Sequence, residues 1–278
     1  MVGNSLTNKT APATFSTFMS SEGVKRKLNE IIGGDKGQSF ITSIVSAVSA
    51  NPALRDCDNS SIFSAGLVGA SLNLAPSKEL GHFYIIPFKT KEGKKAQFQI
   101  GYKGLIQLAV RSGQYKHLNV IEVKEGEMKF YNQLTEEFEF NLIDDPEKRE
   151  KAKTVGYFAM FELLNGFVKT VYWTKAKMES HARKYSQSYN SGKSSFWNDN
   201  FDEMAKKTLL KQILTKWGAM STEMEKVKKY DQATVKDDGS VEYVDNEPYS
   251  EEPVVNVEVV DNTAPAESVE AEFFTEQK

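Results

Sequence analysis

Residues 154–173 read TVGYFAMFELLNGFVKTVYW, and they carry the clearest structural signal in the chain. Two runs rich in β-branched and aromatic residues, 154–164 and 167–173, are joined by Asn165 and Gly166. Asn-Gly is the pair most favoured in a two-residue hairpin turn, because both positions of that turn require a positive φ. The sequence therefore predicts an antiparallel β-hairpin at this point.

Further elements are predicted on both sides of this hairpin. Short β-rich or alternating runs predict strands at 81–88, 96–100, 117–123, 128–131 and 138–142. Apolar residues at helical spacing predict helices at about 22–32, 38–50, 60–74, 101–113 and 199–217. Between them, residues 184–200 are rich in Ser, Asn and Gly and predict a loop that carries aromatic residues.

The bulk composition limits the classes of protein to consider. With 278 residues, 40% of them hydrophobic, the chain can bury one large core or two modest ones. It has no apolar run near the roughly 20 residues that a membrane span needs, and residues 1–20 lack the pattern of a signal peptide. A single cysteine and three scattered histidines give no disulfide and no metal-ligand spacing. We expect a cytoplasmic protein without metal or cofactor.

Charge is distributed unevenly along the chain. From Asp231 onward there are 14 acidic and 2 basic residues, which leaves 33 basic and 24 acidic residues in 1–230. The body is therefore positive and the end strongly negative, a pattern typical of a body that binds a polyanion. We predict a flexible N-terminus (1–20), a binding domain (21–230) and a disordered acidic tail (231–278).

Two motifs resemble catalytic sites. SGKSS at 191–195 resembles the end of a phosphate-binding P-loop, but Gln187 stands where that motif requires glycine. Glu122 and Lys124 match the acidic-x-Lys core of metal-dependent nucleases, in which carboxylates bind the metal and lysine positions the attacking water. Such a site needs a second acidic residue, and the chain has no Asp between Asp58 and Asp144. A nuclease therefore remains the alternative function.

The stretch GYKGLIQLAVRSGQ at 101–114 favours binding of phosphate. A strand runs into Gly101 and Gly104 and then into a helix, whose free N–H groups and dipole attract anions. Lys103 and Arg111 lie on one stripe of that helix at multiples of four residues. The alternatives are a tight turn at the glycines and an ordinary solvated helix face.

A second basic helix lies at about 199–217, where Lys207 and Lys211 are four residues apart beside Lys206. Basic residues and aromatic residues alternate in the loop before it, which is typical of sequence-tolerant single-strand binding. The alternative for Phe196 and Trp197 is that they anchor the start of the helix in the core.

Three blocks together resemble the RecT family of phage recombinases, which anneal single-stranded DNA without ATP. They are NPALRDCDNSSIFSAGLVGASLNLAPSKELGHFYIIPF (51–88), GYKGLIQLAVRSGQ (101–114) and FDEMAKKTLLKQILTKW (201–217), in family order and spacing. The resemblance spans roughly residues 20–230. It breaks down in the loop 185–195 and in the tail, so base stacking by Tyr185 and Tyr189 does not carry over from the family.

The resemblance implies an α+β fold, with a small antiparallel sheet packed on helices, a helical N-terminal part and the acidic tail outside it. It implies binding of single-stranded DNA and of annealed duplex DNA, self-assembly into rings or filaments, a phage or prophage origin, and no catalytic residue. The tail is then a docking segment for a phage exonuclease or a host single-strand binding protein, a competitor of DNA, or an aid to solubility.

On this hypothesis we assign the phosphate contacts to the two basic helices and their surroundings. The main candidates are Lys103, Arg111, Lys206, Lys207 and Lys211, with Gly101 and Gly104 allowing close approach of the backbone. Weaker candidates for the same groove are Lys116, Lys175, Arg183 and Lys184. Candidates for packing against bases or sugars are Tyr102, Phe196 and Trp197.

Overall fold

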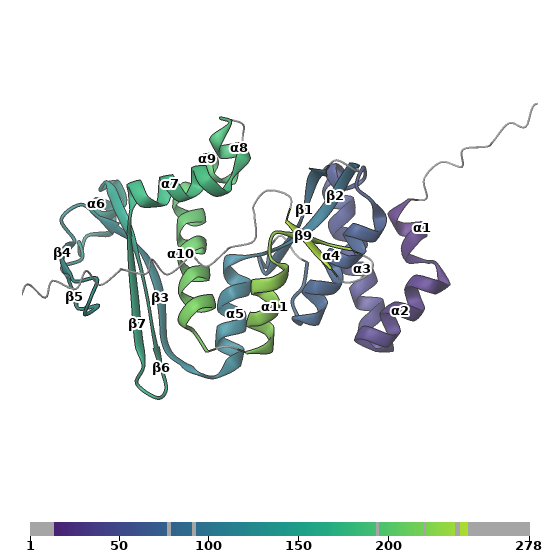
Figure 1. Cartoon of the computed structure of the whole chain (residues 1–278), viewed down its shortest axis with the longest axis horizontal. Coiled ribbons are helices and arrows are strands. Elements are labelled where there is room, and N and C mark those ends of the chain that lie inside the picture. The colour runs from purple at the N-terminus through teal and green to yellow at the C-terminus, as the bar shows by residue number, and fades with distance from the viewer. Residues whose placement is uncertain are drawn as a thin grey trace, which may run out of the picture. The chain divides into compact units, whose positions relative to one another are not determined.

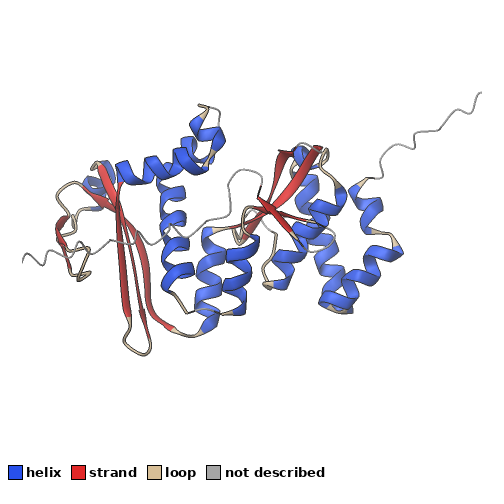
Figure 2. Cartoon of the chain, in the orientation of Figure 1, coloured by secondary structure: helices blue, strands red, loops and turns tan. Residues whose placement is uncertain are grey.

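The computed structural model of the chain describes residues 14–76, 79–90, 93–192, 195–219, 221–236 and 240–243. Helices and antiparallel strands are mixed along these residues, after an N-terminal part made of helices alone (Figure 1, Figure 2). The predicted α+β class, with small antiparallel sheets packed on helices and a helical N-terminal part, is confirmed.

The helices are α1 (Phe15–Met19), α2 (Glu22–Ile32), α3 (Gly34–Ala50), the 3₁₀ turn Pro52–Leu54, α4 (Asn59–Ser71), α5 (Tyr102–Ser112), α6 (Pro146–Lys151), α7 (Lys175–Tyr185), α8 (Gln187–Asn190), α9 (Phe196–Asp199), α10 (Phe201–Trp217) and α11 (Thr222–Tyr230). The strands are β1 (Phe83–Thr90), β2 (Gly93–Ile100), β3 (Tyr115–Lys124), β4 (Met128–Tyr131), β5 (Phe138–Phe140), β6 (Thr154–Leu163), β7 (Val168–Thr174), β8 (Ala233–Val235) and β9 (Val241–Tyr243).

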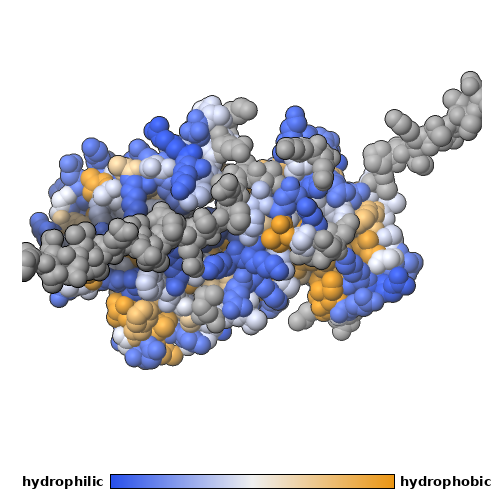
Figure 3. Space-filling view, viewed as in Figure 1, coloured by the Kyte–Doolittle hydropathy of each residue, from blue (hydrophilic) through white to orange (hydrophobic). Residues whose placement is uncertain are grey.

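The predicted hairpin forms strands β6 and β7, and its turn contains Gly166 at a φ of 85°. Register pairs Phe161 with Lys169 and Gly156 with Thr174. Strand β3 joins the other edge of β6, which gives the sheet order β3-β6-β7. Apolar side chains gather on the surface near the turn of this hairpin, where Leu164, Phe167 and Val168 are exposed (Figure 3).

The two faces of this sheet are covered by different elements. On one face, Tyr157 is fully buried and donates its hydroxyl to Asp202 of α10 at 2.5 Å. On the other face, Phe158 packs against the rings of Phe138 and Phe140, both 4.9 Å away, in the small β4–β5 sheet. Because side chains alternate along a strand, neighbouring residues of β6 serve opposite faces. Helix α10 is buried on several sides and forms the centre of this part of the core.

The second sheet has the order β1-β2-β8-β9 and packs on α4. A Cβ on Gly69 would lie 2.2 Å from the ring of Phe83, and a Cβ on Gly66 would lie 1.8 Å from the side chain of Ile44 in α3. The glycines of α4 thus bring the helix close to the sheet on one side and to α3 on the other. This agrees with the buried helix that its small, apolar residues predict.

The described elements extend beyond the boundaries predicted for the binding domain. Helix α1 lies within residues 1–20, and Phe15 and Met19 bury one side of it, so it belongs to the folded part of the chain. Strands β8 and β9 lie within residues 231–278. They also belong to the folded part, since Ala233 of β8 pairs with Phe98 of β2. Residues 1–13 and 244–278, where the flexible terminus and the disordered tail are predicted, lie outside the described residues. No helix in the described ranges is long and apolar enough to cross a membrane.

Candidate nucleic-acid interface

The two glycines at the start of α5 pack against the chain's own backbone. The N–H of Gly101 donates to the carbonyl of His82 at 2.8 Å. A Cβ on Gly101 would lie 1.9 Å from the carbonyl oxygen of Gly81, and a Cβ on Gly104 would lie 2.0 Å from that of His82. Glycine is therefore required here for packing, and close approach to a DNA phosphate at these positions stays a prediction.

Lys103 is exposed on the first turn of α5, and a tyrosine missed by the sequence analysis lies beside it. The hydroxyl of Tyr84 and the side chain of Lys103 come within 3.2 and 3.5 Å of the position that a Cβ on Gly81 would take. The sequence could have indicated that Tyr84 faces outward, because Tyr84 lies between the buried Phe83 and Ile85 on a strand, where side chains alternate between the two faces.

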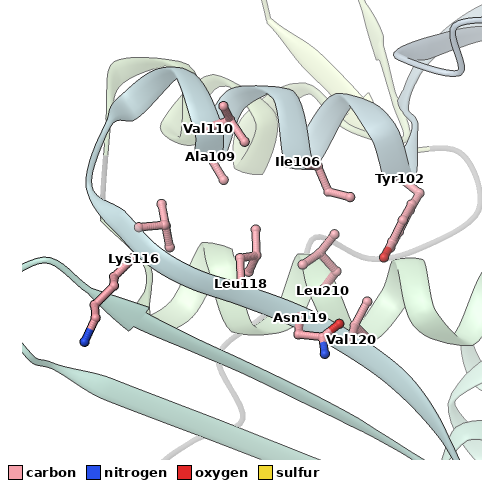
Figure 4. Close-up of a pocket in the computed structure, with 10 residues that line it drawn as sticks. Tyr102, Ile106, Ala109, Val110, Lys116, Leu118, Asn119, Val120 and Leu210 are labelled. Atoms are coloured by element: carbon pink, nitrogen blue, oxygen red, sulfur yellow. The ribbon is translucent and has the colours of Figure 1, made fainter.

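Tyr102 lies in a groove between α5 and β3 rather than on the open surface (Figure 4). The groove is a cavity of about 300 Å³ whose wall includes Ile106 and Val110 of α5, Leu118 of β3 and Leu210 of α10. Burial raises the pKa of the Tyr102 hydroxyl. The ring is thus part of an apolar wall, and stacking of Tyr102 on a base stays a prediction.

Two of the predicted phosphate ligands have acceptors within the chain. The guanidinium of Arg111 donates to the carbonyls of Leu72 and Asn73, at 2.6 and 3.1 Å. These carbonyls follow the last turn of α4, so Arg111 caps the C-terminal end of that helix. The ammonium of Lys116 lies 2.7 Å from Glu162. Arg111 is therefore a structural residue in this fold, whatever its role toward DNA.

The three lysines of α10 have different surroundings. Lys206 lies 2.6 Å from Glu203 and 3.2 Å from Glu122 of β3, and Lys211 lies 2.5 Å from Asp231. For Lys207, no ion pair is found among the described residues. Burial lowers the pKa of Lys207 to about 8, an effect that Asp231 opposes and Lys211 reinforces. Of the three lysines, Lys207 is thus the one that is mostly buried and whose charge is least compensated by a carboxylate.

Glu122 and Lys124, the pair that suggested a nuclease, bond to each other. The ammonium of Lys124 donates to Glu122 at 2.7 Å and to the Thr154 hydroxyl at 2.9 Å. Burial acts to raise the pKa of Glu122, but hydrogen bonds and charges of Lys124 and Lys206 hold it below its usual value. Within the described ranges no three His, Cys, Asp or Glu side chains are grouped so that they could bind a metal ion. The geometry offers this alternative no ligand set.

A row of rings runs along α7 and the end of β7, and of these rings the sequence analysis considered only that of Tyr185 for base stacking. The ring of His181 lies 5.3 Å from that of Trp173 and 4.5 Å from that of Tyr185. Lys177 lies 4.8 Å from the Trp173 ring, and Lys184 lies 5.2 Å from the Tyr185 ring. Part of the signal was present, because residues 177, 181 and 185 are four apart and share one face of α7, whereas Trp173 lies in β7.

The remaining candidates lie on and after α7. Trp197 is buried against Phe201, with ring centroids 5.3 Å apart, so it takes the anchoring role at the start of α10. Phe196 is 67% exposed and is free to contact a ligand. The ammonium of Lys175 lies 5.8 Å from the Phe201 ring, and Arg183 is exposed.

The start of α5 and helix α7 both lie close enough to α10 for its lysines to act on their side chains. Helices α5 and α10 are in contact, and the charge of Lys206 acts on the hydroxyl of Tyr102. The charge of Lys211 acts in turn on the ring of His181 in α7. The structure thus brings the start of α5 and one face of α7, which are far apart in the sequence, close to lysines of α10 that are paired with carboxylates.

Comparison with known proteins shows the family to which the chain is similar. A family model described as the RecT family matches residues 38–247, from α3 to just beyond β9. The uncharacterized protein YqaK of Bacillus subtilis strain 168 is 44% identical over 234 residues, which cover 84% of this chain and 75% of YqaK. Protein RecT of Escherichia coli strain K12 is 36% identical over 186 residues, which cover 65% of this chain and 66% of that protein.

Proposed function

This chain belongs to the RecT family, and on that premise we propose that it is an ATP-independent annealing protein of phage homologous recombination. It binds single-stranded DNA, pairs it with a complementary strand and holds the annealed duplex. Family membership supports recombination, DNA binding and single-strand annealing. The ring or filament, the phage origin and the residues in contact with DNA are parts of the proposal.

The observation that carries the proposal is a set of cations on α5, α7 and α10 that have no ion pair among the described residues. Annealing joins two polyanions and must leave base edges free, so the protein has to contact phosphates and has to do so independently of sequence. Cations on three helices, with aromatic rings beside them, meet this requirement. The reaction breaks no covalent bond, so we expect no catalytic residue.

The cations divide into two groups by their partners. Lys103, Lys175, Arg183, Lys184 and Lys207 have no ion pair within the described residues, and we propose them as the primary phosphate ligands. Lys206 and Lys211 have carboxylate partners, as does Lys116. Because these carboxylates offset their charge, they bind phosphate directly only by exchanging that partner.

For self-assembly we propose the turn of the β6–β7 hairpin as a contact between copies. Leu164 is 68% exposed there, next to Phe167 and Val168, which are also exposed (Figure 3). A contact in which this turn meets a different surface of the next copy is heterologous, and repeated heterologous contacts generate rings or helical filaments. Leu164→Asp should therefore reduce the size of the assembly in light scattering.

Asp231 is buried and paired with Lys211, so the proposed docking segment for a phage exonuclease or a host single-strand binding protein is the set of acidic residues after Glu247. Their excess of negative charge fits a basic surface on such a partner. Co-purification with each partner, for the full chain and for a chain ending at Glu247, tests this. Equal capture of both chains would remove the tail from the interface.

The annealing function is tested with two complementary labelled oligonucleotides mixed with the protein in the absence of nucleotide. We expect annealing without ATP, and an absolute need for ATP would contradict the proposal. Lys103→Ala should weaken binding to all sequences alike and lower the salt slope by about 1. Lys129→Ala, an exposed lysine on β4, is the matched control and should change neither.

The nuclease alternative is tested with the same labelled strands in Mg²⁺ or Mn²⁺. Loss of full-length strand that disappears in Glu122→Gln would support the nuclease. Intact strands in the wild-type protein leave annealing as the activity of the site.

A further inference from the structure

The rings of Trp173, His181 and Tyr185 form a continuous row along one face of α7 and the end of β7. Trp173 is partly buried and packs against the core, whereas Tyr185, at the other end, is half-buried and is not packed against it. The row therefore runs from the core toward the surface. Neighbouring rings of the row are tilted by 58° and 43°. Three rings in contact are more than the anchoring of α7 requires, because Met178 and Ala182 already bury its inner side.

Positive charge surrounds this row at both ends and at its middle. Lys177 lies over Trp173 and Lys184 lies beside Tyr185. Burial first, and then the charges of Lys211, Lys184 and Lys177, lower the pKa of His181 to about 4. The imidazole is thus neutral at pH 7. Lys211 is paired with Asp231, so the uncompensated charge beside the row is that of Lys177 and Lys184, which form no ion pair among the described residues.

The acidic residue of α7 does not neutralise these lysines. Glu179 acts electrostatically on Tyr157, on the face of β6 that packs against α10. Among the described residues, Lys177 and Lys184 form no ion pair, and both are exposed. The row thus combines aromatic faces with uncompensated cations, the combination that binds single strands without preference for sequence.

We propose that the row Trp173–His181–Tyr185 is a stacking site for the bases of a single-stranded polynucleotide, whose flanking phosphates bind Lys177 and Lys184. The inference rests on the proposed function and deepens it, because it names the part of the strand that this site contacts. Stacking engages the faces of the bases and leaves their Watson–Crick edges free to pair. In a duplex the base faces are covered by neighbouring pairs, so the site favours the first, unpaired strand.

The test compares two ligands with the same backbone charge, a fluorescent oligo(dT) and an abasic oligonucleotide of equal length, by anisotropy. The full-length wild-type protein should bind oligo(dT) more tightly than the abasic strand. Tyr185→Leu, which keeps an apolar side chain but removes the π face, should weaken oligo(dT) binding by about tenfold and leave abasic binding unchanged. Tyr185→Phe should restore the wild-type difference.

Tyr230 provides the control, because it is also half-buried and has Lys229 5.1 Å from its ring, although it packs against the core. Tyr230→Leu should change binding of neither ligand, and thermal unfolding should show that both leucine variants are folded. Lys184→Ala should weaken binding of both ligands and lower the salt slope, because it removes a phosphate contact rather than a base contact.

The outcomes separate this inference from the proposed function. If the wild-type protein binds neither ligand, the proposed function fails. If it binds both equally, or if Tyr185→Leu weakens both to the same extent, DNA binding stands and the stacking site is overturned.

Discussion

Asp231 and Lys211 form an ion pair of 2.5 Å that joins the residue after α11 to α10. The other carboxylate oxygen of Asp231 accepts a hydrogen bond from the N–H of Ile100, the last residue of β2, at 2.8 Å. The side chain of Asp231 is 2% exposed and that of Lys211 is 30% exposed. One buried carboxylate thus ties α10, β2 and the chain after Tyr230 together.

We expect Asp231→Ala to lower the free energy of unfolding by about 3 kcal/mol, measured by urea denaturation. The substitution leaves the buried N–H of Ile100 without an acceptor and Lys211 without its partner. Asp56→Ala is the control, because Asp56 pairs with Lys94 at 2.7 Å on the surface. That loss should stay below about 1 kcal/mol. Equal losses would show that the buried carboxylate has no special role.

A second prediction concerns where the chain can be shortened. A protein ending at Glu247 retains Asp231, β8 and β9, and should unfold at the same temperature as the full chain and still bind DNA. A protein ending at Tyr230 loses the carboxylate at Ile100 and the pairing of Ala233 with Phe98, so it should be markedly less stable. Thermal unfolding followed by circular dichroism distinguishes the two. Equal stability would place the end of the folded body at Tyr230 after all.

A third prediction separates two roles of Arg111. Since its guanidinium caps α4 through Leu72 and Asn73, Arg111→Ala should lower the free energy of unfolding by about 1–2 kcal/mol. If Arg111 also contacts phosphate, DNA affinity measured well below the unfolding transition should fall too, with a smaller salt slope. A loss of stability with unchanged affinity and salt slope would make the residue purely structural.

Local signals in the sequence were sufficient where neighbouring residues make the structure. The β6–β7 hairpin follows from Asn165 and Gly166, and the buried helix α4 follows from its small, apolar residues. The strand β8 was missed because it has three residues and its partner, Phe98, is distant in the sequence. A segment that short has no periodicity of its own, so only the tertiary pairing defines it.

The candidate site shows the same limit in its side chains. The requirement for glycine at 101 and 104 was visible, but the atoms that impose it belong to Gly81 and His82. Similarly, the basic stripe of α10 was visible, whereas the acceptors of Lys206 lie partly on β3. Charge patterns reveal where cations are, and only the tertiary structure reveals which of them are already neutralised.

Lys207 gives the last prediction, because its environment works against its charge. Burial lowers the pKa of Lys207 to about 8, whereas the unfolded chain retains that proton up to about pH 10.4. Between these values the unfolded state binds more protons, so this group makes stability rise with pH. Below pH 8 both states are protonated, and the full cost of the buried charge is present.

Lys207→Met should therefore raise the free energy of unfolding at pH 7, by up to about 3 kcal/mol, and flatten its rise between pH 8 and 10. Lys206→Met, the neighbouring control, should lower it, because Glu203 loses its partner and Glu122 loses one of its two. If Lys207 meets a phosphate, Lys207→Met also weakens DNA binding at pH 7. Wild-type affinity then falls as pH rises through 8, and the variant lacks that fall.

A variant that is more stable and binds DNA as well as the wild type at every pH would exclude Lys207 from the interface. A stabilised variant with impaired binding would show that the chain retains a destabilising cation because DNA requires it.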